Sequence, residues 1–275
     1  IDISERACFM DEFIYEEFDV IQISRDRGKL ASKQMSKKVI SEIALKIFVN
    51  DMEMVTLLCL GQYQKELALG FLYTEGVISS MDDIEKIEYN SRLHAVMVYL
   101  KEGIPVDKSE SLRSVTSGCG KCYTYINPLK KDRYKPVESS KKYSFEEILN
   151  IMKDFGRQSK IFMNVGGVHS ALLHSPEHKI FIEDIGRHNC LDKITGILVK
   201  ERCLEAALES MLFLSGRVSS EIIAKTARNQ IPILVSRATP TTSAVRLAEQ
   251  FNITLIGYVR NDKGYVYTCP ERIIF

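Results

Sequence analysis

Residues 211–237 read MLFLSGRVSSEIIAKTARNQIPILVSR, and this stretch decides the fold of the C-terminal half of the chain. It holds two short apolar runs, each followed closely by a serine and an arginine, with a helical pattern between the runs. Short, continuously apolar runs that alternate with helices are typical of buried parallel strands. The stretch therefore predicts a strand–helix–strand unit of an α/β sheet.

The same pattern recurs on both sides of this stretch. Residues 180–185 hold four apolar residues and lead through Gly186 into another helical pattern, and residues 253–258 form a closing, mostly apolar run. Ahead of them, residues 168–174 and 179–184 flank a short polar turn, which predicts an antiparallel hairpin. We therefore expect a mixed sheet with helices on both faces.

Four arginines share one position in this pattern, just past the end of a predicted strand. Ligands of such sheets bind beyond the carboxyl ends of the strands. Guanidinium groups grip phosphate through two N–H groups, and helix N-termini add unpaired backbone N–H groups. The pattern predicts an anion or nucleotide site, although neither a Walker A loop nor a Rossmann glycine fingerprint is present. Its candidate residues are Arg187, Arg217, Arg237, Arg260 and the predicted helix start at Thr241, Thr242 and Ser243.

A histidine and two acids accompany these arginines. His188 follows Arg187, and Asp192 lies one helical turn beyond it. Such a pair can transfer protons, but a histidine at this place can equally cap or pack a helix, so both interpretations stay open. Asp184, at a predicted strand end, could pair with one of the arginines.

The N-terminal part, residues 1–114, predicts a smaller α+β domain. A helix is expected over 64–75, because apolar residues share one face and Gly76 follows. Residues 13–24 partly alternate and predict a strand, whereas the basic, polar residues 25–38 predict an exposed loop. Two hairpins are expected, at 44–49 with 54–60 and at 84–89 with 95–100.

Residues 115–142 predict a mobile loop that carries the motif SGCGKC. Cys119 and Cys122 lie three positions apart with Lys121 between them, and a nearby cation favours the nucleophilic thiolate. The pair could also be a redox pair or half of a zinc site, although no second pair of this kind exists in the chain. The residues favour sulfur chemistry and leave the other two readings open.

Composition limits the remaining choices. Lys and Arg number 37 against 36 Asp and Glu, so the net charge draws the protein toward neither nucleic acid nor membrane. Seven cysteines without a disulfide spacing indicate a reducing compartment. No apolar run is long enough to span a bilayer, and the first residues do not resemble a signal peptide. The expected third unit, residues 143–275, begins with a capping box at Ser144 and Glu147.

Six blocks of the chain together resemble one family, the FdhD/NarQ formate dehydrogenase accessory sulfurtransferases. They span almost the whole chain in the family's order. The blocks are ELALGFLYTEG (66–76), SGCGKC (117–122), GGVHS (166–170), EDIGRHN (183–189), SGRVS (215–219) and PILVSR (232–237).

This resemblance implies a cytoplasmic, homodimeric enzyme with a cytidine-deaminase-like C-terminal domain. The enzyme would take persulfide sulfur from a cysteine desulfurase. It would pass the sulfur to the molybdenum (or tungsten) cofactor, bis-molybdopterin guanine dinucleotide, for formate dehydrogenase. A cofactor-binding chaperone that transfers no sulfur is the alternative.

The resemblance also assigns residues. The persulfide falls on Cys119, and Cys122 would assist or be dispensable. The guanine-dinucleotide segment falls on Tyr258, Val259, Arg260, Asn261, Asp262 and Lys263. Asp262 stands where family members often have glycine.

The likeness to zinc deaminases stops at the expected fold. Those enzymes need an H-x-E motif and a later P-C-x-x-C motif. Here no H-x-E occurs, and Gly118 rather than proline precedes Cys119. We therefore expect no catalytic zinc.

Overall fold

The computed structural model describes residues 14–106, 113–115 and 134–275. Its centre is a six-stranded sheet in the order β10-β9-β11-β12-β13-β14. Strands β9 and β14 run antiparallel to their neighbours, whereas β10, β11, β12 and β13 share one direction. The strands are β9 (His169–His174), β10 (Lys179–Asp184), β11 (Met211–Leu214), β12 (Ile233–Ser236), β13 (Thr254–Arg260) and β14 (Lys263–Thr268).

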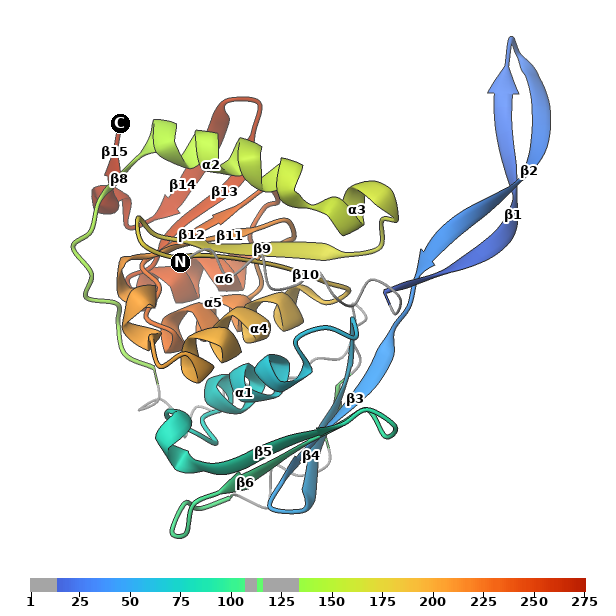
Figure 1. Cartoon of the computed structure of the whole chain (residues 1–275). Helices are drawn as coiled ribbons and strands as arrows, with labels where there is room; N and C mark the ends of the chain where they lie inside the picture. The colour runs from blue at the N-terminus through green and yellow to red at the C-terminus, as the bar shows by residue number, and fades with distance from the viewer. Residues whose placement is uncertain (1–13, 107–112, 116–133) are drawn as a thin grey trace.

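Helices cover both faces of this sheet, as the sequence predicts (Figure 1). Successive residues of a strand face opposite sides of the sheet. In β11, Phe213 therefore packs toward α2, whereas Leu212 and Leu214 pack toward α4 and α5. A short pair of parallel strands forms a separate two-stranded sheet. These elements are α2 (Phe145–Gln158), α3 (Lys160–Asn164), α4 (Arg187–Lys200), α5 (Ser220–Arg228), α6 (Thr242–Gln250), β8 (Tyr143–Ser144) and β15 (Ile273–Ile274).

The N-terminal part holds a second sheet, in the order β5-β6-β3-β4-β7, against which α1 packs. Both predicted hairpins and the predicted helix are confirmed. Asn50 and Asp51 turn the first hairpin with φ of 45° and 65°, the left-handed pair that a tight hairpin turn needs. The elements are β3 (Ile43–Val49), β4 (Met52–Cys59), α1 (Gln64–Thr74), β5 (Ile84–Asn90), β6 (Ala95–Leu100) and β7 (Arg113–Val115).

Helices α1 and α4 join the two parts through backbone contact. A Cβ added at Gly70 would lie 1.7 Å from the carbonyl oxygen of Asp192, and one added at Gly196 would lie 1.7 Å from that of Glu66. Only glycine allows so close a crossing at both points. Residues 134–142, the described end of the predicted mobile loop, lie against the end of α6, where the Val137 amide donates to the Phe251 carbonyl.

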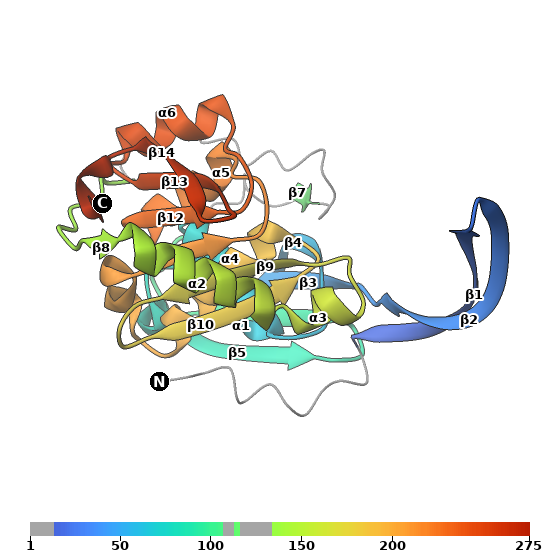
Figure 2. The same cartoon turned by 90° about the horizontal axis from the view of Figure 1, so that it is seen from above.

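A long hairpin projects from the body as an arm (Figures 1 and 2). It consists of β1 (Tyr15–Asp26) and β2 (Lys29–Ile40), which pair antiparallel over their full lengths. The predicted strand over 13–24 is confirmed, but the predicted loop over 25–38 is wrong, because most of it is strand β2. An exposed strand need not alternate apolar and polar residues, so hydrophobic periodicity gives no strand signal over residues 25–38.

Candidate functional site

The four arginines lie at one edge of the larger sheet, because β10, β11, β12 and β13 all end there. The loops that follow β11 and β12 run side by side. Val218 pairs with Pro240, and the Thr241 amide donates to the Val218 carbonyl over 3.0 Å. Arg217, Arg237 and Arg260 are exposed, whereas Arg187 is half-buried.

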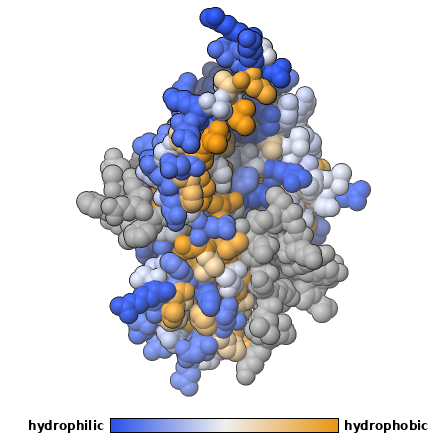
Figure 3. All heavy atoms as spheres, turned by 90° about the vertical axis from the view of Figure 1, so that its right-hand side faces the viewer, coloured by the Kyte–Doolittle hydropathy of each residue, from blue (hydrophilic) through white to orange (hydrophobic). Residues whose placement is uncertain are grey.

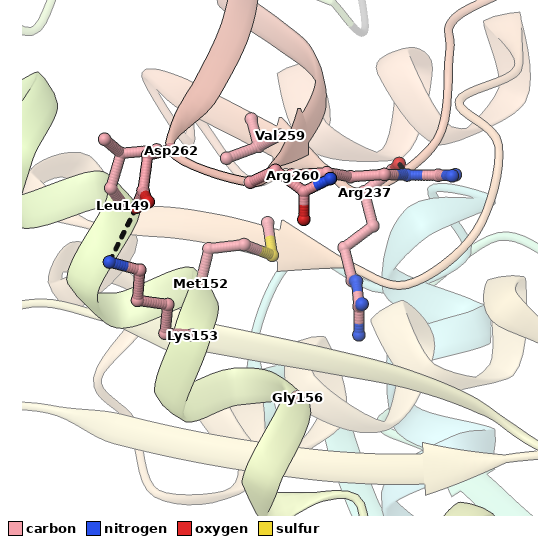
Figure 4. Close-up of a pocket in the computed structure, with 9 residues that line it drawn as sticks. Leu149, Met152, Lys153, Gly156, Arg237, Val259, Arg260 and Asp262 are labelled. Atoms are coloured by element: carbon pink, nitrogen blue, oxygen red, sulfur yellow. Dashed lines mark hydrogen bonds and ion pairs between the residues drawn. The ribbon is translucent and has the colours of Figure 1, made fainter.

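A pocket of about 530 Å³ opens between α2 and the ends of β12 and β13 (Figure 4). It combines two exposed arginines with apolar walls and with the turn that joins β13 to β14. Its lining residues are Leu149, Met152, Lys153, Gly156, Arg237, Val259, Arg260, Asn261 and Asp262. Four of the six residues that the resemblance assigned to the nucleotide segment are therefore in the lining.

Neighbouring groups fix the positions of Arg260 and Arg237 at the pocket. The Nε of Arg260 donates to the carbonyl oxygen of Arg237 over 2.7 Å, and its guanidinium lies 4.7 Å from the centre of the Tyr258 ring. A Cβ added at Gly156 would lie 3.1 Å from Nη1 of Arg237. Glycine at this point of α2 thus leaves room for the guanidinium at the pocket wall.

The β13–β14 turn forms the rim of the pocket. Asn261 and Asp262 both have positive φ, 49° and 60°, and the strands pair again at Arg260 and Lys263. The Nζ of Lys153 lies 2.6 Å from the Asp262 carboxylate, as Figure 4 shows. Lys153, the cation at the rim of the pocket, is therefore already paired with the Asp262 carboxylate.

Sequence reasoning missed the contribution of α2. Lys153, Met152 and Gly156 carry no motif, and α2 was expected only as a covering helix. One signal was present, since a glycine inside an amphipathic helix often marks a close approach.

A second group of polar side chains lies where α4 and α5 begin. His188 Nε2 is 3.0 Å from Glu221, and a Cβ added at Gly216 would lie 3.0 Å from His169 Nδ1. Burial, followed by the nearby Arg187, lowers the pKa of His169, which favours its neutral form. Arg187 Nε is buried without a hydrogen-bond partner among the described residues. This group adjoins the arginine edge but contributes nothing to the lining of the pocket.

The predicted helix start at Thr241 is confirmed. The Thr241 hydroxyl accepts a hydrogen bond from the Ala244 amide over 3.2 Å, so it caps α6. Thr242 and Ser243 follow in the first turn and are exposed. Like Arg187, His188 and Arg217, these residues lie at the same sheet edge as the pocket but outside its lining.

Two acids that the sequence placed near the arginines serve the fold instead. Asp184 is fully buried, and its carboxylate lies 2.5 Å from Lys193 rather than beside an arginine. Asp192 lies 2.6 Å from Lys225 and accepts a hydrogen bond from Thr74. The Asp192 carboxylate is therefore engaged by Lys225 and Thr74, and proton transfer between His188 and Asp192 stays a prediction.

The described cysteines are poor nucleophiles. Burial raises the pKa of Cys59 to about 12 and that of Cys190 well above its ordinary value. Burial also raises the pKa values of Cys203 and Cys269. A thiol reacts as its thiolate, so none of these four is suited to attack at neutral pH. Cys119 and Cys122 lie outside the described residues.

The strand that leads to Cys119 and Cys122 ends close to the arginine edge. Val115, the last residue of β7, pairs with Leu57 of β4. Immediately beyond, the Leu58 carbonyl accepts a hydrogen bond from Asn189, and the Leu60 amide donates to Asp184. Asp184 and Asn189 flank Arg187, so β4 and β7 both point toward the edge where the arginines lie.

No three His, Cys, Asp or Glu side chains converge into a metal site in the described ranges. No helix within those ranges is long and apolar enough to cross a bilayer.

The fold and the site define a mixed α/β protein with an arginine-lined pocket at the carboxyl edge of its sheet. A family model described as the FdhD/NarQ family matches residues 40–274, and the chain belongs to this family.

Curated relatives cover nearly the whole chain. One from Bacillus subtilis, named Sulfur carrier protein FdhD, is 35% identical over 263 residues, which cover 93% of this chain and 98% of the relative. A relative of the same name from Listeria innocua is 34% identical over 250 residues, or 88% of this chain and 93% of its own.

A solved structure shares the fold. It is the crystal structure of a proposed formate dehydrogenase accessory protein from Desulfotalea psychrophila, with a TM-score of 0.73 and 24% identity. The match covers 94% of this chain and 99% of that one.

Proposed function

We propose that this protein is a sulfur carrier that acts as a sulfurtransferase for formate dehydrogenase. It accepts persulfide sulfur from a cysteine desulfurase on Cys119 and delivers it to bis-molybdopterin guanine dinucleotide in the cytoplasm. Membership of the family and the curated names of the relatives support the carrier role. The cytidine-deaminase-like arrangement of the C-terminal part belongs to the same proposal.

The observation that carries the proposal is that β4 and its neighbour β7 end beside the sheet edge where the arginines lie. An edge with three exposed arginines suits the phosphates of a dinucleotide, and guanidinium groups bind phosphate in a two-pronged way. Strand β7, which precedes the SGCGKC block, points toward that edge. A carrier needs its thiol and its acceptor site on the same side of the molecule.

Sulfur acceptance is a thiol exchange. The Cys119 thiolate attacks the terminal sulfur of the donor persulfide, the sulfur–sulfur bond of the donor breaks, and the donor cysteine leaves as a thiolate. Cys119 then carries the persulfide. For delivery, attack of the Cys122 thiolate on the Cys119 sulfur releases the carried atom as sulfide and leaves a disulfide, so the two electrons come from this chain.

Intact-protein mass spectrometry tests the carrier step directly. After incubation with a cysteine desulfurase and cysteine, the protein gains the mass of one sulfur atom, and Cys119→Ser does not. Cys203→Ser is the matched control, because this partly exposed thiol has a raised pKa and should leave the gain unchanged. Sulfur found on Cys119→Ser would contradict the role of Cys119.

A second assay separates the carrier from a chaperone that only binds the cofactor. Cys119→Ser should retain guanine nucleotide binding but fail to activate formate dehydrogenase. Full activation by this variant would favour the chaperone.

A further inference from the structure

Arg187 is a half-buried cation that no described residue neutralises. Its guanidinium makes no hydrogen bond or ion pair within the described ranges, and its Nε is buried. Asp184, at the end of the preceding strand, is engaged by Lys193 and by the Leu60 amide instead. Taking a charge out of water is costly unless the charge is paired. The position of Arg187 therefore favours the binding of an anion.

Ser219 supplies a second donor of the same kind. It is the N-cap residue of α5, yet its hydroxyl caps no amide of the helix, whereas Thr241 at the equivalent place on α6 caps the Ala244 amide. The Ser219 hydroxyl is buried and has no partner in the part of the chain that the structure describes. Because an N-cap serine normally satisfies an amide of the first turn, both the hydroxyl and that amide stay available to a ligand.

Gly216 brings these donors into one group. A Cβ added there would lie 3.0 Å from His169 Nδ1 and 3.5 Å from Arg187 Cδ, so the loop between β11 and α5 passes directly against both side chains. Ser219 ends the same loop. This side of the molecule, on which β9 starts after α3, faces the viewer in Figure 3, which shows polar side chains among apolar ones.

The remaining charges of the group favour a ligand with a single negative charge. Glu221 lies in the first turn of α5, and its carboxylate is 3.0 Å from His188 Nε2. Burial, followed by the nearby Arg187, lowers the pKa of His169, so this ring adds no cation near neutral pH. A phosphate dianion would meet the Glu221 carboxylate, and like charges repel strongly away from water. A small anion that carries a proton could bind the cation and also donate to this carboxylate.

The group lies between the strand that leads to the SGCGKC block and the arginine pocket. On one side Asn189, in the first turn of α4, donates to the Leu58 carbonyl over 2.8 Å, just beyond the point where β4 pairs with the end of β7. On the other side the Ser236 hydroxyl donates to the Gly216 carbonyl over 2.7 Å, and the next residue, Arg237, lines the pocket. Sulfur that moves from the thiols to the pocket would pass this group.

We propose that Arg187 and Ser219, with the N-termini of α4 and α5, bind the hydrosulfide ion that sulfur delivery releases. The inference rests on the proposed carrier function. When the Cys122 thiolate attacks the inner sulfur of a protonated persulfide on Cys119, the bond between the two persulfide sulfurs breaks, a disulfide forms and hydrosulfide leaves. Its sulfur accepts hydrogen bonds from Arg187 and Ser219, and its S–H group donates weakly to Glu221.

Titration calorimetry with sodium hydrosulfide tests the site. The full chain carries Cys119→Ser and Cys122→Ser and is kept without oxygen or chloride, so thiol exchange contributes no heat. Arg187→Gln should raise the Kd for hydrosulfide by about tenfold or more, because a hydrogen bond to a charged group is lost. Ser219→Ala should raise it about fivefold, and Ser219→Thr, which keeps the hydroxyl, should largely restore it. Arg246→Gln removes an exposed arginine of α6 and is the control.

Two further measurements separate binding from a structural role. Arg187→Gln removes a charge that has no partner among the described residues, so the midpoint of thermal unfolding should stay equal or rise. Bromide is a singly charged ion of similar size to hydrosulfide and can be located in crystals by its anomalous scattering. A bromide peak should lie between Arg187 and Ser219 and should disappear in Arg187→Gln.

Several results would overturn the site. One is equal hydrosulfide affinity in Arg187→Gln and the unchanged protein, and another is an equal loss in Arg246→Gln. A lowered unfolding midpoint in Arg187→Gln would assign this arginine to the fold. Inorganic phosphate serves as the competing ligand in the same titration. If Arg187→Gln weakens phosphate binding more than hydrosulfide binding, the group is a phosphate site and the hydrosulfide assignment is wrong.

The fate of the carrier function is read separately, from the sulfur mass gained by Cys119 in the unchanged protein. Loading of Cys119 without hydrosulfide binding that depends on Arg187 would leave the carrier role intact and remove the site. Hydrosulfide binding that depends on Arg187, without loading of Cys119, would keep the anion site and remove the carrier role.

Discussion

The α1–α4 interface and the arginine edge both contain conspicuous charged residues, but these residues are buried at the interface and exposed at the edge. At the interface Lys193 and Lys225 are buried and paired with Asp184 and Asp192. At the edge Arg217, Arg237 and Arg260 are exposed to solvent. The first arrangement holds the two parts of the chain together, and the second leaves cations free to bind a ligand.

Burial decides which of these roles a cation has. Burial alone would lower the pKa of Lys225, but the nearby anions, above all Asp192, outweigh it and raise the pKa. Such a lysine is charged but inaccessible. An exposed guanidinium, by contrast, keeps its hydrogen-bond donors available for phosphate. Substitutions at the interface should therefore change stability, and substitutions at the edge should change binding.

The largest effect is expected at the helix crossing. Gly196→Ala brings a Cβ to 1.7 Å from the Glu66 carbonyl, so α1 and α4 must separate. We expect a loss of about 3 kcal/mol or more in the free energy of unfolding, measured by urea denaturation. Gly61→Ala is the control, since its added Cβ would meet only ordinary contacts near 3.9 Å. Equal stability of the two variants would contradict the tight crossing.

The next effect concerns the buried ion pair. Lys225→Met leaves the Asp192 carboxylate buried without its cation and should cost about 3 kcal/mol of unfolding free energy. Lys200→Met removes the cation of a more exposed pair with Glu66 and should cost less than about 1 kcal/mol. If the two variants lose equal stability, burial is not what separates these pairs.

At the edge the effect should fall on binding alone. Arg260→Ala and Arg237→Ala should each weaken binding of GDP by about tenfold to a hundredfold, because a charged hydrogen bond to phosphate is lost. Arg217→Ala should weaken it as well if the site extends along the edge. Titration calorimetry measures the affinity, and thermal unfolding should be nearly unchanged. Arg157→Ala, on the exposed side of α2, is the control. Unchanged GDP affinity in both Arg217→Ala and Arg260→Ala would remove the case for an anion site here.

The smallest expected change in stability comes from substitutions of Asp262, at the rim of the pocket. Asp262 has a φ of 60°, a conformation that glycine adopts without cost. Asp262→Gly loses the exposed ion pair with Lys153, which contributes little. The net effect should be a gain of about 0.5 kcal/mol in the free energy of unfolding. The freed lysine should also tighten GDP binding. Asp262→Asn separates the two causes, because it removes the charge but keeps a side chain at this φ. Weaker GDP binding by Asp262→Asn would show that the carboxylate does not compete with phosphate.

Short stretches of sequence were enough to predict many of the strands, turns and helix caps. Apolar runs predicted β9 to β13 of the larger sheet and β3 to β6 of the smaller one, because a buried strand face must be apolar. Strand β14 was not predicted, since most of its residues are exposed or half-buried. The turn at Asn50 and the cap at Ser144 were readable for the same reason, since each depends on a few adjacent residues. The arginines were predicted to meet at one edge because parallel strands end together.

Contacts between residues far apart in the sequence could not be predicted from it. Asp184 and Lys193 are nine residues apart, yet both also contact Leu60 in the other part of the chain. Lys153 and Gly156 reach the pocket only because α2 lies across the ends of β12 and β13. Nor could the polar strand β2 be separated from a loop, since exposed strands carry no period.

By itself the sequence determined the order of most strands and helices, the clustering of the arginines and the likeness to the family, all of which rest on local pattern. Tertiary structure alone decided which charges are buried and paired, that Gly70 and Gly196 bring two helices into backbone contact, and that α2 completes the pocket. The physical reason is that burial and pairing depend on distance in space, which the linear order of residues does not encode.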